Sequence, residues 1–313
     1  MNNYNPPKPV QKQQDSPIAD LSYRNYNGEL KTRGLRWWVI SWTMMKLLKK
    51  NVGFWITSAL VFLIYFLNGV QLYFTSNMPA GMNPFGGDEK TKYTLTFFQV
   101  NSGTNLLLFI IALTVGSGAI SADNKANALL VYLSKPLTKA DYLLGKWMVI
   151  FFTLFLETFV PSLVLYLYCL TSYLDKGFLK NDPMLFFKMI AAACVPAVMH
   201  ASLLVGASAW SKAPRIASVF YASLYFGSLV VTGMVFGIVY RGDLERGQEV
   251  LKLSLSGMMD GIQQIIYHVT IKNPMATLAI PSPSLIVPLA IGLCVAGIAA
   301  ARAKINAVEV VKG

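Results

Sequence analysis

Six long apolar stretches constrain the fold of this chain more than any other feature. A helix needs about 20 mostly apolar residues to cross the hydrocarbon core of a bilayer. Only 13% of the residues are charged and 54% are hydrophobic, whereas a soluble domain has about 25% charged residues. The sequence therefore predicts an all-α, polytopic membrane protein with one transmembrane domain, residues 34–313. Its six transmembrane helices are expected at about 54–75, 100–120, 142–172, 185–210, 216–240 and 284–303.

The residues before the first span divide into two parts. Residues 1–33 are polar and rich in Asn, Gln and Pro, a composition typical of disorder, so we expect a disordered cytoplasmic tail. The sequence LRWWVISWTMMKLLKKNVGFW follows. Its indole rings suit the headgroup level of a membrane, and its lysines can meet anionic lipid. We expect an N-terminal interfacial helix there; the alternative is a simple extension of the first span.

Basic residues are distributed unequally between the two sides of the predicted bundle. With the N-terminus inside, 18 of the 27 Lys and Arg residues lie on the inner side. The positive-inside rule then places both termini in the cytoplasm of a plasma (inner) membrane. Orientation in the lipid bilayer thus accounts for the net charge of +12, and we expect no nucleic-acid partner. The 18 comprise nine in 1–50, four in 122–146, and Lys212, Arg215, Arg302, Lys304 and Lys312.

Motifs for catalysis and cofactor binding are missing from the sequence. It contains no GxxxxGK[ST] nucleotide loop, no HExxH, no GxSxG and no CxxC pair, and its three cysteines lie in apolar runs. Such cysteines behave as small buried hydrophobes. We therefore expect no enzyme activity, no metal site and no cofactor bound by this chain.

Two ionisable residues nevertheless lie within apolar runs, at Glu157 and His200. A carboxylate at that depth is costly, so Glu157 is either a functional contact for a proton, cation or substrate, or a residue that locks helix packing. His200 could belong to a metal or acid–base site, but a hydrogen-bonded packing histidine is the favoured interpretation.

Two features concern the ends and surface of the bundle. Gly233 and Gly237 form GMVFG, a GxxxG pattern that permits close backbone approach, either at a dimer contact or within one bundle. In the long outer segment 241–283, Ile262, Ile265, Ile266 and Val269 recur at helical spacing. We expect a short helix there that dips into the outer leaflet.

The segment ISADNKANALLVYLSKPLTKADYLLGK, residues 120–146, separates the second and third spans on the inner side. Residues 126–133 are expected to form a short helix that exposes leucines, and Pro136 ends it. A new helix starts at Thr138 and continues into the third span. A short cytoplasmic helix with exposed apolar side chains fits a groove on a partner protein; the alternative is a connector that lies on lipid.

This segment resembles the signature of ATP-binding-cassette (ABC) exporter permeases. The likeness is to the six-span ABC-type-two class, which includes the permeases grouped with copper-enzyme maturation. It rests on Ile120, Asp123 and Leu129, on residues 133–139 (LSKPLTK) and on residues 142–146 (YLLGK). The sequence departs from the family pattern at three places: Asn124 stands for a base, Lys125 for an acid, and Asn127-Ala128 for Gly-Thr.

The resemblance implies the permease subunit of an exporter that works with a separate ABC ATP-binding subunit, and with a second copy of itself. ATP and Mg²⁺ would be held by the partner subunit. The coupling helix and turn, within residues 121–141, would dock on the ATPase. A non-transporting scaffold that recruits an ATPase, or less plausibly an intramembrane enzyme, is the alternative. The implied docking residues are Asp123, Lys125, Leu129, Leu130, Leu133, Ser134, Lys135, Pro136 and Lys139.

The unequal distribution of basic residues predicts which loops an impermeant thiol reagent reaches in intact cells. Single cysteines that replace Asn83 and Gln248, in a chain without its native cysteines, should be labelled from outside. A single cysteine that replaces Ser134 should be labelled only after the membrane is permeabilised. Labelling of the Ser134 position in intact cells would reverse the predicted orientation.

Overall fold

The computed structural model of the chain describes residues 36–77, 91–128, 137–240, 243–272, 277–278 and 280–307. This part consists of helices joined by turns and short loops, with one two-stranded antiparallel ladder. The predicted tail at 1–33 lies outside the described residues. The elements are α1 (Arg36–Leu48), α2 (Val52–Asn77), α3 (Lys92–Gly116), α4 (Ser121–Lys125), α6 (Lys139–Ser172), α7 (Phe178–Asn181), α8 (Leu185–Trp210), α9 (Pro214–Val239), α10 (Leu244–Leu251), α11 (Leu255–Tyr267), β1 (Ile271–Lys272), β2 (Thr277–Leu278) and α12 (Pro283–Asn306).

Among the described residues, six helical segments are long and apolar enough to cross a membrane: α2, α3 with α4, α6, α8, α9 and α12. The prediction of an all-α, six-span protein is thereby confirmed. The bounds differ most at the second span, where α3 begins at Lys92 rather than near residue 100. Its first turn is polar in sequence, yet Tyr93 and Thr94 are buried. The Thr94 hydroxyl donates to Asp182 Oδ2 at 3.0 Å, so contacts within the protein replace the missing apolar character.

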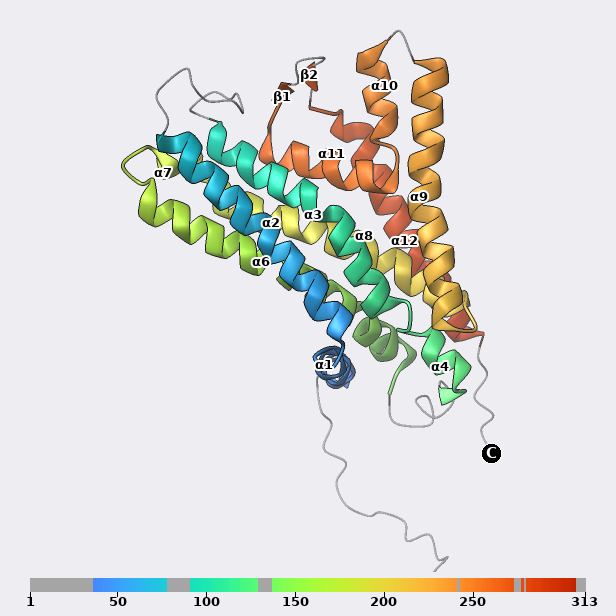
Figure 1. Cartoon of the computed structure of the whole chain (residues 1–313). Helices are drawn as coiled ribbons and strands as arrows, with labels where there is room; N and C mark the ends of the chain where they lie inside the picture. Colours follow the sequence, from blue (N-terminus) through green and yellow to red (C-terminus); the bar gives the residue numbers. More distant parts are fainter. Residues whose placement is uncertain are drawn as a thin grey trace, which may run out of the picture. The chain divides into compact units, whose positions relative to one another are not determined.

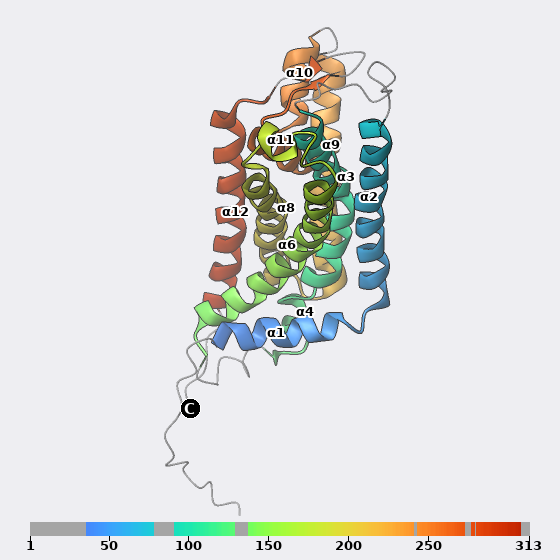
Figure 2. The same cartoon turned by 90° about the vertical axis from the view of Figure 1, so that its left-hand side faces the viewer.

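The helices run between two ends that carry different elements. α1, α4, the first turns of α6 and the last turns of α12 lie at one end (Figures 1 and 2), which is named the inner end after the orientation that the basic residues predict. α7, α10, α11 and the small sheet lie at the opposite, outer end (Figure 1). This arrangement agrees with six spans that cross in alternating directions.

α8 is the central helix of the bundle. In its most apolar stretch 72% of the residues are buried, compared with 11% in α9. α8 packs against α12, α6, α3 and α11. Small side chains permit this, because they allow helix backbones to approach closely in a membrane. At the α8–α12 crossing, a Cβ added to Gly206 would lie 2.7 Å from the carbonyl oxygen of Gly297, so neither helix tolerates a larger residue there.

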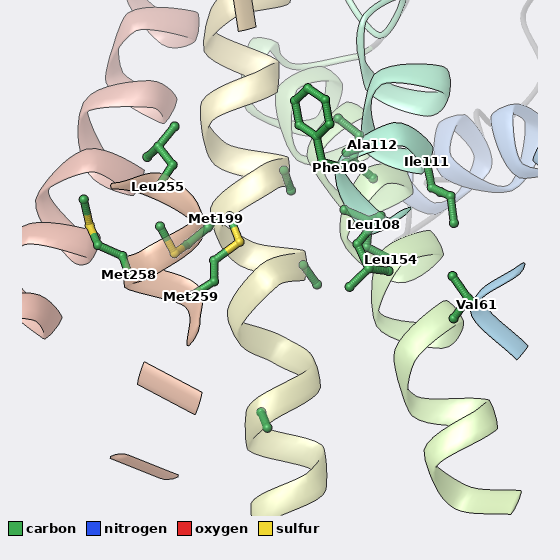
Figure 3. Close-up of a cluster of buried hydrophobic side chains, with 14 of the residues drawn as sticks. Val61, Leu108, Phe109, Ile111, Ala112, Leu154, Met199, Leu255, Met258 and Met259 are labelled. Carbon is green, nitrogen blue, oxygen red and sulfur yellow. The ribbon is translucent and has the colours of Figure 1, made fainter. Parts of the chain in front are cut away.

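The core is apolar over most of its length and includes the outer helix α11. Figure 3 shows Met199 of α8 beside Met258 and Met259 of α11, with Leu108 and Phe109 of α3 on the other side of α8. Methionine side chains adapt to irregular gaps of this kind. α11 therefore packs into the bundle on α3 and α8 rather than standing apart from it. The predicted short helix is present at the outer end and contains Ile262, Ile265 and Ile266, whereas Val269 lies beyond its last residue, Tyr267.

α1 is a separate helix rather than an extension of the first span. The turn at Lys49–Asn51 ends it, and α2 starts at Val52. Figure 2 shows α1 lying across the inner ends of the other helices. Trp38 and Trp42 are exposed on it, and Lys46 Nζ lies 5.5 Å from the ring centroid of Trp42. These exposed indoles and the lysine fit an interfacial helix.

Candidate functional site

The short helix α4 lies at the inner end, where the chain leaves α3 (Figure 1). Its sequence, SADNK, is polar, and a helix of five residues cannot hold itself in place. Contacts with the longer helices must therefore fix its position. They come from the first turns of α6 and from the last turn of α8.

A buried ion pair joins α4 to α6. Lys146 Nζ lies 2.7 Å from Asp123 Oδ2, and the two side chains are only 5% and 15% exposed. The Tyr142 hydroxyl donates to the same carboxylate oxygen at 2.7 Å. Removing one partner of a buried pair leaves an uncompensated charge, which costs about 3–5 kcal/mol. Asp123 thus points into the protein and holds α4 on α6.

Hydrogen bonds join α4 to the end of α8. The Ser208 hydroxyl accepts from the backbone N–H groups of Ile120 and Ser121, at 3.0 and 2.9 Å. The Asn124 amide donates to the carbonyl oxygens of Ala209 and Ser211, at 2.9 and 3.2 Å. The last carbonyls of a helix need such partners. Asn124, which departs from the pattern that this segment resembles, therefore caps the end of α8.

The chain leaves α4 through a turn, not through a continuous helix. Asn127 has φ 50, in the left-handed region that asparagine tolerates better than most residues. The prediction of a helix beginning at Ala126 is therefore wrong at its start, because Ala126 and Asn127 form a turn. Lys125 is exposed. Leu129, Leu130, Leu133, Ser134, Lys135 and Pro136 lie outside the described residues.

α6 restarts the helical path with a capping box. Asp141 N–H donates to the Thr138 hydroxyl at 3.0 Å, and Thr138 N–H donates to the Asp141 carboxylate at 3.4 Å. This reciprocal pair satisfies two backbone donors at the helix start. Next to it, Lys139 Nζ donates to the carbonyl oxygen of Asn306 at 3.2 Å, joining α6 to the end of α12.

α1 crosses α6 at Gly145, one residue before the buried Lys146. The Ser41 hydroxyl donates to the Gly145 carbonyl at 2.8 Å. A Cβ at position 145 would lie 2.9 Å from the carbonyl oxygen of Trp37, so the crossing requires glycine. Gly145 thus contacts α1, and Lys146 binds α4. Two neighbouring residues of the YLLGK sequence therefore attach two other helices to α6.

Glu157 and His200 lie apart from this inner region. Glu157 Oε1 accepts from the Ser58 hydroxyl of α2 at 2.8 Å, while Oε2 has no partner among the described residues. His200 is fully buried, and its Nδ1 lies 2.7 Å from the Tyr221 hydroxyl. Its ring stacks on Tyr225. In the described part of the chain no cluster of His, Cys, Asp or Glu could hold a metal. His200 Nε2, like Glu157 Oε2, is buried and has no hydrogen-bond partner among the described residues.

The two glycines of GMVFG lie on a face of α9 that the bundle does not cover. A Cβ added to Gly233 or Gly237 would meet no atom within 4 Å. Val230 and Met234, nearby on the helix, are 53% and 59% exposed. The glycines therefore do not serve close packing among the described residues of one chain.

Sequence reasoning missed a polar cluster at the outer end, where α3 meets α11. Asp260 Oδ1 accepts from the Ser102 hydroxyl at 2.8 Å and from the Asn105 amide at 2.6 Å. Burial raises the pKa of the Asp260 carboxyl and lowers that of Lys252 to about 8. Asn101 extends the cluster by donating to the Tyr267 hydroxyl at 2.7 Å. Asn101, Ser102 and Asn105 lie close together in one predicted span. These polar residues in an apolar run are the pattern from which the cluster could be predicted.

A model of the family described as ABC-2 family transporter protein matches residues 38–300. The chain belongs to the ABC-2 transporter family. The match begins in α1, includes five spans whole and reaches into α12. Membership makes this chain the multi-pass membrane permease of an ABC transporter, a system in which a partner binds ATP. No curated protein matches the chain.

Proposed function

We propose that this ABC-2 permease is an exporter subunit that receives mechanical force from a separately encoded ATPase through residues 121–141. The observation that carries the proposal is the way α4 is held. The Asp123–Lys146 pair joins it to α6, and Ser208 with Asn124 joins it to α8. A force on α4 would therefore reach both helices together.

The coupling needs two states with different contacts between the permease and the ATPase. Closure of the ATPase pair around ATP and Mg²⁺ would displace α4 and tilt α6 and α8, opening a path for the substrate. ATP and Mg²⁺ remain on the partner, and this chain supplies no group for hydrolysis. Both termini and the inner end then face the cytoplasm of the plasma (inner) membrane, as the basic residues of 1–50 favour.

The residues of 121–141 have two proposed roles. Some would contact the ATPase and form the contact part, and others attach α4 to the rest of the bundle and form the holding part. Leu129, Leu130 and Leu133 are the proposed anchors in the ATPase groove, and Ser134, Lys135 and Pro136 are proposed to contact it next to them. Lys125 is exposed at the end of α4 and would meet an acidic rim on the partner. Asp123 belongs to the holding part, because its carboxylate is occupied by Lys146 and Tyr142. Lys139 also acts inside the chain, through its bond to Asn306.

Replacement of Leu129 by Asp tests the contact part. A leucine buried at an interface contributes roughly 1.5–3 kcal/mol, and an unpaired charge in the same place adds a desolvation cost. Leu129→Asp should insert into the membrane normally but lose co-purification of the ATPase and permease-dependent ATP hydrolysis. Lys125→Glu should weaken the complex less, and the loss should shrink at high salt.

Asp175→Lys, a charge change on an exposed residue near the outer end, is the control and should leave ATPase binding unchanged. ATPase binding by Leu129→Asp at the wild-type level would show that 121–141 is only a surface connector.

We further propose that two copies of this chain pair along the exposed face of α9 that carries Gly233 and Gly237. Glycines spaced by four residues let two helix backbones approach closely, and the bundle itself does not use this face. Pairing would leave α4 of each copy available to its own ATPase subunit.

The pairing predicts that Gly233→Leu with Gly237→Leu weakens the dimer, since the added side chains hold the backbones apart. The measurement is the mass of the purified protein in detergent, over a dilution series. Gly292→Leu, at an uncovered position on α12, is the matched control and should not change the mass. A double variant that dimerises as strongly as the wild type would place the pairing face elsewhere.

A further inference from the structure

A groove at the inner end lies between the first turns of α6 and the last turns of α12. Its volume is about 630 Å³. α12 packs mainly on α8 and makes few contacts with α6, so the groove lies between α6 and α12. The lining residues are Lys139, Ala140, Leu143, Leu144, Trp147, Ile298, Arg302, Ile305 and Asn306.

The groove combines a cationic rim with an apolar wall. Lys139 and Arg302 are its two charged residues, and no acid is among the residues that line it. The nearby Asp141 carboxylate is turned to Thr138, whose hydroxyl donates to it at 2.7 Å. On the apolar wall, Leu144 and Ile298 are 38% and 37% exposed. A ligand that fits must carry negative charge at one end and hydrocarbon at the other.

The position of the groove along the spans indicates where such a ligand would come from. The residues that line the groove belong to the start of α6 and the end of α12. α1 lies at the same end of the bundle (Figure 2) and exposes Trp38 and Trp42. Tryptophan is enriched where hydrocarbon meets headgroups, so this end lies at that level of the bilayer. Basic pockets between membrane helices at this level bind the phosphates of anionic lipids.

We propose that the groove binds one anionic phospholipid of the inner leaflet. Its phosphate would lie between Lys139 and Arg302, and one acyl chain would follow the wall formed by Leu144 and Ile298. The bond between Lys139 and the carbonyl of Asn306 holds the ammonium group at the rim in advance. The lipid would then bridge α6 and α12, which make few direct contacts. This site does not depend on ATPase docking.

Lipid titration of the purified, delipidated full chain, followed by native mass spectrometry, tests the proposal. Phosphatidylglycerol should bind, while phosphatidylcholine with the same acyl chains should bind at least tenfold more weakly. Each basic residue near a membrane surface strengthens binding about fivefold. Lys139→Gln and Arg302→Gln should therefore each weaken phosphatidylglycerol binding about fivefold, and the double variant about 25-fold.

Lys304→Gln is the matched control, because Lys304 lies near Arg302 in sequence but its Nζ sits 5.4 Å from the ring centroid of Trp210. It should bind phosphatidylglycerol as the wild type does. Ile298→Trp, which fills the apolar wall and keeps both cations, should also lose phosphatidylglycerol. Equal binding of the two lipids, full binding by the double variant, or displacement of the lipid by millimolar inorganic phosphate would overturn the proposal.

Discussion

The inner end of this permease depends on one buried ion pair, Asp123–Lys146. α4 is too short to be stable alone, and a buried carboxylate without its lysine would carry a large desolvation cost. The pair, together with the hydrogen bonds to the end of α8, therefore holds α4 in place on α6. Lys146 follows Gly145, where α1 crosses, so three helices meet within two consecutive residues. A partner that pushes on α4 would act on a joined group of helices rather than on a loose loop.

The outer end is joined by a different kind of contact. There α11 is fixed to α3 by Asp260, Ser102 and Asn105, and to α8 by apolar packing around Met259. α8 links the two ends, because it receives α4 at Ser208 and α11 along its outer half. Its small residues allow this central position. A movement of α4 and an opening of the outer end would therefore both involve α8.

Much of the fold could be predicted from the sequence, because span length and the position of charges depend on local composition. The six spans, the separate α1 and the outer helix all follow from such patterns. The role of Asp123 in holding α4 could not be predicted, because it depends on the tertiary contact with Lys146 of α6. From the sequence alone, a polar residue between two spans suggests a contact at the surface. The close contact between Gly206 and Gly297 could not be predicted for a similar reason, because it joins two helices that are distant in sequence.

The most direct test of the coupling account compares two lysine variants of the reconstituted permease–ATPase complex. Lys146→Met breaks the pair with Asp123, whereas Lys188→Met breaks the Lys188–Asp182 pair near the outer end, whose atoms are 2.8 Å apart. The measurement is the permease-dependent stimulation of ATP hydrolysis at equal complex content. The account predicts that Lys146→Met retains the ATPase but loses the stimulation, while Lys188→Met keeps it. Wild-type stimulation with Lys146→Met, or an equal loss in both variants, would contradict it.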